Sequence, residues 1–212
     1  NDIRISIEKG DEWLHNFPLF LGINKKNPPQ IAIWTEDTEG HYLSTIYVTY
    51  KIATQTWQAA GGNRRKEALP HWCYSRGIKY EDGLYLPTKK SPLTDAATGA
   101  TPKGSFDVKL TPTGKIKKFI VKVEINHSTD WNNAYPKSAQ QGDSNYSGGK
   151  EGSGQPALDY AAEVNLTSGE KEIQLNLIGH SSPDGSDGDI TTDISSITTA
   201  LNIVKSITIN LK

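Results

Sequence analysis

The segment 180–189 contains four side chains that could bind a metal ion: His180, Asp184, Asp187 and Asp189. Carboxylates in a glycine-containing loop can surround a hard cation such as Ca²⁺, which takes about six to eight oxygen ligands. Their spacing differs from the alternating aspartates and the closing glutamate of known calcium loops. Serine, proline, aspartate and glycine are also typical of a solvated turn between two strands. The sequence therefore leaves two alternatives for this segment, a Ca²⁺ site and a connecting loop.

A threonine that could carry a covalent cofactor ends the segment 95–101, Asp-Ala-Ala-Thr-Gly-Ala-Thr. This segment resembles the attachment motif of extracytoplasmic flavoproteins, in which a flavin transferase esterifies FMN to the last threonine. The resemblance implies FMN on Thr101 and a redox role. The further Ser or Thr that usually follows such motifs within two or three residues is replaced by Pro102, Lys103 and Gly104, which are typical of a turn before a strand. We therefore favour a turn, with FMN at Thr101 as the alternative.

Aromatic rings on loops could form a carbohydrate-binding surface, because an indole face fits the C–H face of a pyranose. The aromatic residues in or near predicted loops are Trp13, Trp57, Trp131, Tyr135 and Tyr146. Trp131 is the best candidate, since its neighbours Asp130 and Asn132 could hydrogen-bond sugar hydroxyls, and Tyr135 completes the set. Such rings could equally cover the open ends of a β-sandwich, so both interpretations stay open.

The single cysteine of the chain, Cys73, directly follows His71 and Trp72. A cysteine near a histidine can be a nucleophile or a metal or haem ligand. A free cysteine is also among the most frequently buried residue types, and tryptophan is a common core residue. We therefore expect a buried thiol beside a buried indole.

Alternation of hydrophobic and polar side chains recurs along the chain and helical periodicity is scarce, which predicts β-strands. The predicted strands are 3–7, 30–36, 42–51, 104–110, 117–125, 157–166, 172–178 and 204–211. The acidic segment 36–40 predicts a hairpin turn between the second and third of them. Helix is expected only as short pieces, within 64–75, which Pro70 divides, and within 194–202. The chain is thus predicted to be all-β, a sandwich with long loops and at most short helices.

Length and charge limit the possible functions. The 212 residues, with no convincing linker, predict a single domain over 1–212, in which the Gly/Ser-rich segment 138–155 is a flexible loop. A net charge of −1 lacks the basic excess of nucleic-acid-binding proteins, so no nucleic-acid partner is expected. No apolar run approaches ~18 residues, so no transmembrane segment is expected. The start at Asn1 and the absence of methionine indicate a removed leader, through which the protein could have been tethered.

Three segments together resemble an uncharacterised family of predicted periplasmic bacterial proteins, known only as a domain of unknown function. These segments are 31–37, 64–72 and 179–185. In addition, the segment 98–109 resembles the start of a strand in immunoglobulin-like modules. The resemblance implies an immunoglobulin-like β-sandwich and a periplasmic or cell-surface location. Members are often encoded near flavin transferases, which adds some weight to FMN at Thr101 but assigns no residue.

These observations favour a non-enzymatic, extracytoplasmic binding or interaction module of the bacterial cell envelope. An envelope protein or a carbohydrate is the expected partner, and no resident cofactor is expected. A redox carrier with FMN on Thr101 is the main alternative, and Ca²⁺ at the acidic segment is a further one. An uncharacterised hydrolase that uses His180, an aspartate and a serine comes third, since no Gly-x-Ser-x-Gly elbow marks a nucleophile.

Overall fold

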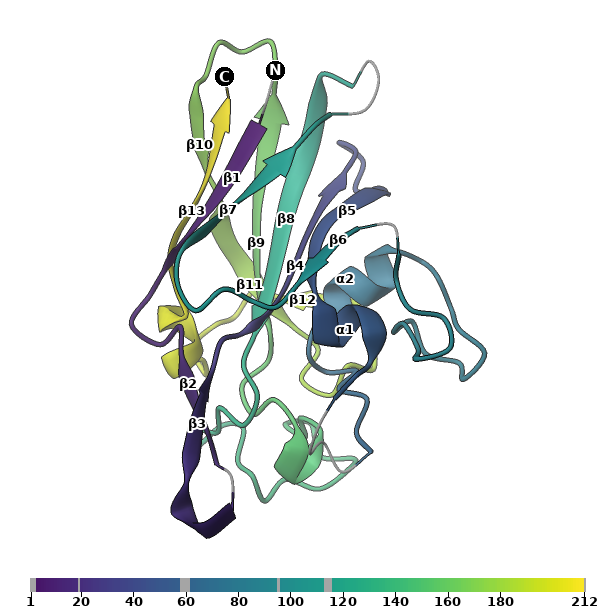
Figure 1. Ribbon diagram of the computed structural model, residues 1–212, viewed down its shortest axis with the longest axis vertical. Helices are drawn as coiled ribbons and strands as arrows, with labels where there is room; N and C mark the ends of the chain where they lie inside the picture. The colour runs from purple at the N-terminus through teal and green to yellow at the C-terminus, as the bar shows by residue number, and fades with distance from the viewer. Residues whose placement is uncertain (1–2, 19, 58–61, 95, 113–115, 212) are drawn as a thin grey trace.

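The computed structural model describes residues 3–18, 20–57, 62–94, 96–112 and 116–211, and its strands form two large sheets and a small hairpin (Figure 1). The smaller of the two large sheets contains, in spatial order, β10 (Glu172–Gln174), β13 (Val204–Leu211), β1 (Ile3–Lys9) and β7 (Phe106–Leu110). The larger contains β12 (Ile190–Thr191), β11 (Asn176–Ser181), β9 (Leu158–Asn165), β8 (Lys118–Asn126), β4 (Gln30–Glu36), β5 (Tyr42–Thr49) and β6 (Ala97–Gly99). The hairpin pairs β2 (His15–Pro18) with β3 (Asn24–Asn27).

Helical structure in the described chain is limited to short pieces. These are the helices α1 (Tyr50–Thr54) and α2 (Pro70–Ser75) and the 3-10 turns η1 (Phe20–Gly22), η2 (Gly149–Glu151) and η3 (Thr199–Asn202). The prediction that Pro70 divides the segment 64–75 is confirmed, because α2 begins at this proline. Proline is favourable at the first position of a helix, since an N–H group there has no partner within the helix. The part before Pro70 forms turns instead of the expected helix.

Strand β4 explains why the chain has two hydrophobic cores. Its Ile31 and Ile33 belong to the core between the two sheets. Ala32 and Trp34 point to the opposite face, where they pack with residues of α1 and α2. Because both faces of β4 are buried, its sequence is a nearly continuous hydrophobic run. The structure is therefore a β-sandwich with an additional, mostly irregular layer on the outer face of the larger sheet (Figure 1).

The hairpin turn predicted between β4 and β5 is confirmed. Oδ1 of Asp37 accepts hydrogen bonds from the backbone N–H groups of Glu39 and His41, at 2.9 and 2.8 Å. Gly40 adopts φ 88°, a conformation that costs glycine little. The two strands then pair antiparallel, from Ala32 with Val48 onward.

The predicted strand 172–178 is wrong in one respect, because the structure divides it between the two sheets. Gln174 pairs with Thr208 in the smaller sheet, whereas Asn176 pairs with Ala161 in the larger sheet. Leu175, which is buried, is the crossing point. The alternation of side chains does not show this crossing, since it continues unbroken through both halves.

The Gly/Ser-rich segment 138–155 consists of turns and η2, and its second half lies against the rest of the chain. Ser147 and Ser153 are buried, and the N–H of Ser153 donates to the carbonyl of Ser147 at 2.9 Å. A Cβ on Gly152 would lie 1.9 Å from the same carbonyl oxygen, so only glycine fits there. Glycine in this segment therefore permits close packing.

Candidate functional site

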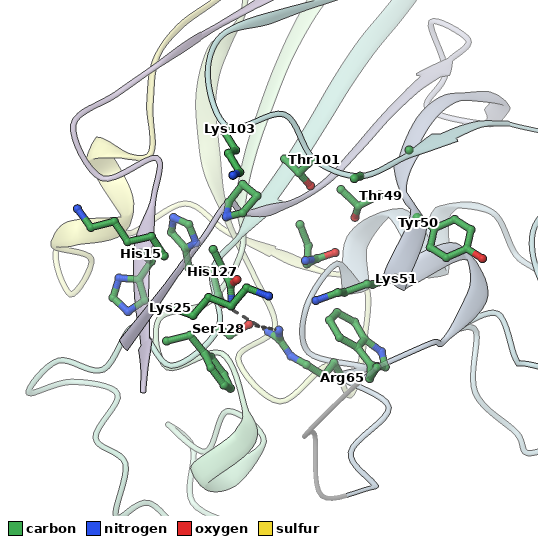
Figure 2. Close-up of a pocket in the computed structure, with 18 of the residues that line it drawn as sticks. His15, Lys25, Thr49, Tyr50, Lys51, Arg65, Thr101, Lys103, His127 and Ser128 are labelled. Carbon is green, nitrogen blue, oxygen red and sulfur yellow. Dashed lines mark hydrogen bonds between the residues drawn. The ribbon is translucent and has the colours of Figure 1, made fainter. Parts of the chain in front are cut away.

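A cavity of about 430 Å³ lies between the β2–β3 hairpin, the start of α1 and the segment 99–103 (Figure 2). Parts of the chain that are far apart in sequence meet here. Lys25 comes from β3, Lys51 from α1, and Lys103 from the segment before β7. The volume is within the range of about 300–1,000 Å³ that is typical of small-molecule sites.

The residues around this cavity, which we call the basic pocket, carry an excess of positive charge. The lysines and the arginine among them are Lys25, Lys26, Lys51, Lys103 and Arg65. Of the lining residues that the structure describes, Glu151 alone has a carboxylate. Because the net charge of the whole chain is −1, this excess is local. A cavity lined by one sign of charge concentrates ions of the opposite sign.

Lys25 and Lys51 point toward each other across the basic pocket (Figure 2). Partial burial lowers the pKa of Lys51, and the charges of Lys25 and Arg65 lower it further. Within the described part of the chain, neither lysine forms an ion pair. An anion bound between the two ammonium groups would offset their repulsion.

Arg65 lies at the base of the basic pocket and is 2% exposed. Its guanidinium donates hydrogen bonds to the side chains of Ser128, Asn126 and Ser153. Its Nε lies 3.5 Å from Oε1 of Glu67, which is 1% exposed. Burial is the main cause that lowers the pKa of Arg65 and raises the pKa of Glu67. The guanidinium is therefore a fixed cation, held by the surrounding structure.

The backbone of Arg65 is strained. It adopts φ 58°, in the left-handed region that residues other than glycine seldom occupy. Asn63 supports this conformation, since its Oδ1 accepts the backbone N–H of Arg65 at 2.7 Å. Strained residues are concentrated at functional sites, and here the strained residue supplies the base of a cavity.

Trp57 adds an aromatic wall to the basic pocket. Nζ of Lys51 lies 5.7 Å, and Cζ of Arg65 5.2 Å, from the centre of its ring. Both distances are within the ~6 Å of a cation–π interaction. The indole thus helps to hold two cations at the cavity without neutralising them.

His127 lines the basic pocket without adding charge. Burial lowers the pKa of His127 to about 3, so the ring is neutral near pH 7. Its Nε2 lies 2.8 Å from the carbonyl oxygen of Glu12, and its ring centre lies 5.2 Å from that of His15.

Thr101, the candidate FMN acceptor, lies in the wall of the basic pocket (Figure 2). Its hydroxyl donates a hydrogen bond to the carbonyl of Pro29 at 2.7 Å. The preceding residues of the motif form β6, which pairs in parallel with β5, so they are not a turn alone. Asp95, the first residue of the motif, lies outside the described residues.

The candidate Ca²⁺ ligands are distributed over a strand and the loop after it: His180, Asp184, Asp187 and Asp189. The histidine is buried in β11, and its Nδ1 lies 2.9 Å from the carbonyl oxygen of Ser181. No three of these four side chains bring ligand atoms within 4.8 Å of one another. In the described part of the chain, the group that does so consists of Asp37, Glu39 and His41 in the exposed β4–β5 turn.

The candidate sugar-binding residues lie together, and most of them are committed to internal contacts: Trp131, Asp130, Asn132 and Tyr135. Asp130 is 4% exposed, and its carboxylate accepts the hydroxyl of Thr199 at 2.6 Å. The amide of Asn132 donates to the carbonyl of Ser196 at 2.9 Å. Tyr135 is buried, whereas Trp131 is half-buried. The polar groups of this set thus attach their loop to the segment 196–199.

A second group of ionisable residues lies buried beneath α2. Glu124 accepts the backbone N–H groups of His71 and Trp72, at 3.1 and 2.8 Å, and so caps this helix. The hydroxyl of Ser181 contacts both Glu124 and Asp159. A hydroxyl has a single hydrogen, so a proton on one of the two carboxyl groups would allow both contacts to be hydrogen bonds. In agreement, burial raises the pKa of Glu124 to about 7 and the pKa of Asp159 well above its usual value.

Lys122 and Cys73 complete this buried group. Nζ of Lys122 lies 2.9 Å from Oε2 of Glu36 and 3.0 Å from Nε2 of His71. The prediction of a buried thiol is confirmed, and burial raises the pKa of Cys73 far above its usual value. Together these contacts fix α2 to the outer face of the larger sheet.

All five histidines of the chain lie in its described part. The partners of their ring nitrogens are backbone carbonyl groups, the carboxylates of Asp37 and Glu39, and the ammonium group of Lys122. The described residues therefore contain no hydrogen-bonded Ser–His pair of the kind that a hydrolase would use.

Trp57 also borders a second cavity, of about 660 Å³. Its lining mixes both signs of charge: Arg64, Lys89, Lys90, Glu81 and Asp82. Arg64 forms an ion pair with Asp82, so part of this charge is already compensated. Arg65 of the basic pocket is likewise paired, with Glu67, but the four lysines there face a single carboxylate among the lining residues that the structure describes. The basic pocket is therefore the stronger candidate for a site that takes an anion.

Most residues of the basic pocket could not be identified from the sequence. Lys25 and Lys51 belong to no motif, Arg65 lies in a segment that carries a family resemblance but no site, and their distances along the chain suggest no common site. The adjacent Lys25 and Lys26 were the one available signal, a local charge pair in a weakly charged chain.

No helix in the described ranges is long and apolar enough to cross a membrane. No protein-family model matches this chain, and no curated protein or solved structure matches it either. The geometry of the basic pocket is therefore the basis on which a function can be argued.

Proposed function

We propose that this protein is a non-enzymatic binding module whose basic pocket takes a small organic anion. One observation carries the proposal: Lys25 and Lys51 face each other in a cavity of ligand size, and neither has an ion-pair partner in the described chain. A phosphate or carboxylate group fits between two ammonium groups. The aromatic wall of Trp57 would contact the apolar body of the ligand.

Phenyl phosphate is a suitable probe, because phenol is its uncharged match. We expect phenyl phosphate to bind and phenol not to bind in isothermal titration calorimetry. Lys51→Ala should weaken binding about tenfold, since one of two charge-assisted contacts is lost. Lys109→Ala is the matched control, because Lys109 lies on β7 and does not line the pocket.

Two results would argue against the proposal. Equal binding by the Lys51 and Lys109 variants would place the anion elsewhere. Absence of binding by the unaltered protein at low salt, where charge attraction is strongest, would remove the basis for an anion site.

A redox carrier with FMN on Thr101 is the second candidate function. What favours it is that Thr101 lines the same cavity as Lys25, Lys51 and Lys103, so a phosphate ester at its hydroxyl would face cations. The existing hydrogen bond of Thr101 to the carbonyl of Pro29 would have to break, since esterification removes the hydroxyl hydrogen.

Coexpression with a flavin transferase tests this candidate. If Thr101 is the acceptor, the exported protein should be yellow and heavier by one FMN group in intact-mass measurement, and Thr101→Ala should be colourless and unmodified. Thr98→Ala is the control, because Thr98 belongs to the same motif but precedes the acceptor. Unmodified protein, obtained while a known acceptor is labelled in parallel, would leave the anion-binding proposal alone.

The same proposal includes a place for the protein. The resemblance of three segments to periplasmic proteins supports a periplasmic or cell-surface location in a bacterium. An immunoglobulin-like arrangement of the sandwich is also proposed, and two facing, mainly antiparallel sheets support it. An envelope protein or carbohydrate remains a proposed partner, through surfaces other than the basic pocket.

A further inference from the structure

The tip of the β2–β3 hairpin exposes hydrophobic side chains. This hairpin projects from the end of the sandwich (Figure 1). Leu21 is 81% exposed and Ile23 is 59% exposed, more than any other large hydrophobic residue that the structure describes. A single exposed hydrophobic residue is common, but two of them close together on a projecting tip indicate a contact surface.

The hairpin combines this apolar tip with positive charge. The sequence from Phe17 to Ile23, Phe-Pro-Leu-Phe-Leu-Gly-Ile, contains no charged residue. Lys25 and Lys26 follow directly, and both are exposed. No aspartate or glutamate occurs between His15 and Asn27, so nothing within the hairpin neutralises the two lysines.

We propose that this tip docks on an anionic lipid bilayer. Leu21 and Ile23 enter the boundary between head groups and acyl chains, and Lys25 and Lys26 contact the anionic head groups. A narrow, convex tip does not provide the roughly 800 Å² per partner that a standard protein interface needs. A bilayer accepts such a tip, since lipids rearrange around it. Lys25 and Lys26 also line the basic pocket, whereas Leu21 and Ile23 do not, so substitutions at the tip test membrane docking without changing the pocket.

Co-sedimentation with vesicles tests the proposal on the whole chain. The protein should sediment with vesicles made of equal parts phosphatidylcholine and phosphatidylglycerol, and much less with phosphatidylcholine alone. Leu21→Ser combined with Ile23→Ser should lower this binding about tenfold, since most of the inserting apolar surface is lost. The matched control is Leu43→Ser with Ile78→Ser, which changes two other exposed hydrophobic residues.

A second variant reports insertion directly. The fluorescence of Leu21→Trp should shift to shorter wavelength with the anionic vesicles, because the indole leaves water. The proposal is overturned if the unaltered protein does not sediment, or if the tip and control variants bind equally. Binding that requires Lys25 and Lys26 but not the tip would mean adsorption by charge alone, and would also overturn it.

Discussion

Arg65→Ala is expected to lower the free energy of unfolding by about 3–5 kcal/mol, the range found when one partner of a buried ion pair is removed. The loss is large because Glu67, 1% exposed, would remain in the interior without its counter-charge. The hydrogen bonds of Arg65 to Ser128, Asn126 and Ser153 would also be lost. Urea unfolding, followed by the fluorescence of the tryptophans, measures this change.

A double-mutant cycle separates the cost of leaving Glu67 unpaired from the cost of losing the packing of the Arg65 side chain. Arg65→Ala with Glu67→Ala should recover part of the stability, since neither charge is then left unpaired. Arg4→Ala is the surface control, because Arg4 pairs with Asp107 while 45% of its side chain is exposed. Its expected cost is roughly 0–1 kcal/mol. A cost for Arg65→Ala as small as the Arg4 cost would show that the buried pair contributes little.

The second prediction concerns how the free energy of unfolding depends on pH. The dependence comes from the carboxyl groups of Glu124 and Asp159. A group whose pKa is higher in the folded than in the unfolded state binds more protons when folded. The free energy of unfolding therefore falls as the pH rises between the two pKa values. For Glu124, this interval runs from 4.5 to about 7, and for Asp159 the pKa is also raised in the folded state.

His127 acts in the opposite direction over part of this interval. Its pKa is about 3 in the folded protein, against an ordinary value of 6.5, so its contribution to stability is lost as the pH falls below 6.5. The two effects oppose each other in mildly acidic solution. Above pH 6.5 the carboxyl pair dominates, so stability is expected to decline there.

Asp159→Asn isolates this contribution. The amide stays neutral and can donate to Ser181 as a protonated carboxyl group does. Compared with the unaltered protein, its free energy of unfolding should decline less steeply above neutral pH, by up to about 1.4 kcal/mol per pH unit for one proton. Urea titrations at several pH values give this slope, and Asp107→Asn on the surface serves as control. Equal slopes for the unaltered protein and Asp159→Asn would mean that folding does not raise the pKa of Asp159.

The sandwich could be predicted from the sequence because hydrophobic residues that alternate with polar ones mark the buried face of a strand. Ile3, Ile5 and Ile7 alternate with polar residues, and all three are buried in the core between the sheets. The predicted strand 30–36 has the observed bounds of β4. The β2–β3 hairpin was missed, because Asn24–Asn27 is polar throughout and is held by pairing with β2 alone.

The candidate site was less accessible to prediction, since its residues come together through the fold and not through spacing. The left-handed backbone of Arg65 and the approach of Lys25 to Lys51 leave no mark in the sequence. The charged and aromatic residues that did stand out have other surroundings. Asp130 and Tyr135 are buried in hydrogen-bonded contacts, and Asp184 lies in a loop held by serine hydroxyl groups.

The pairing of β1 with β13 affects how the protein can be made. Ser206 on β13 hydrogen-bonds to Glu8 on β1, 198 residues away along the chain. Because β13 also lies between β1 and β10, the smaller sheet cannot assemble until residues 204–211 have been synthesised. Contacts between such distant residues slow folding. In the larger sheet, β4 and β5 are joined by a short turn, and the last strand of this sheet, β12, ends at Thr191. This sheet can therefore form before β13 is made, and its apolar inner face then stays uncovered until the smaller sheet packs on it.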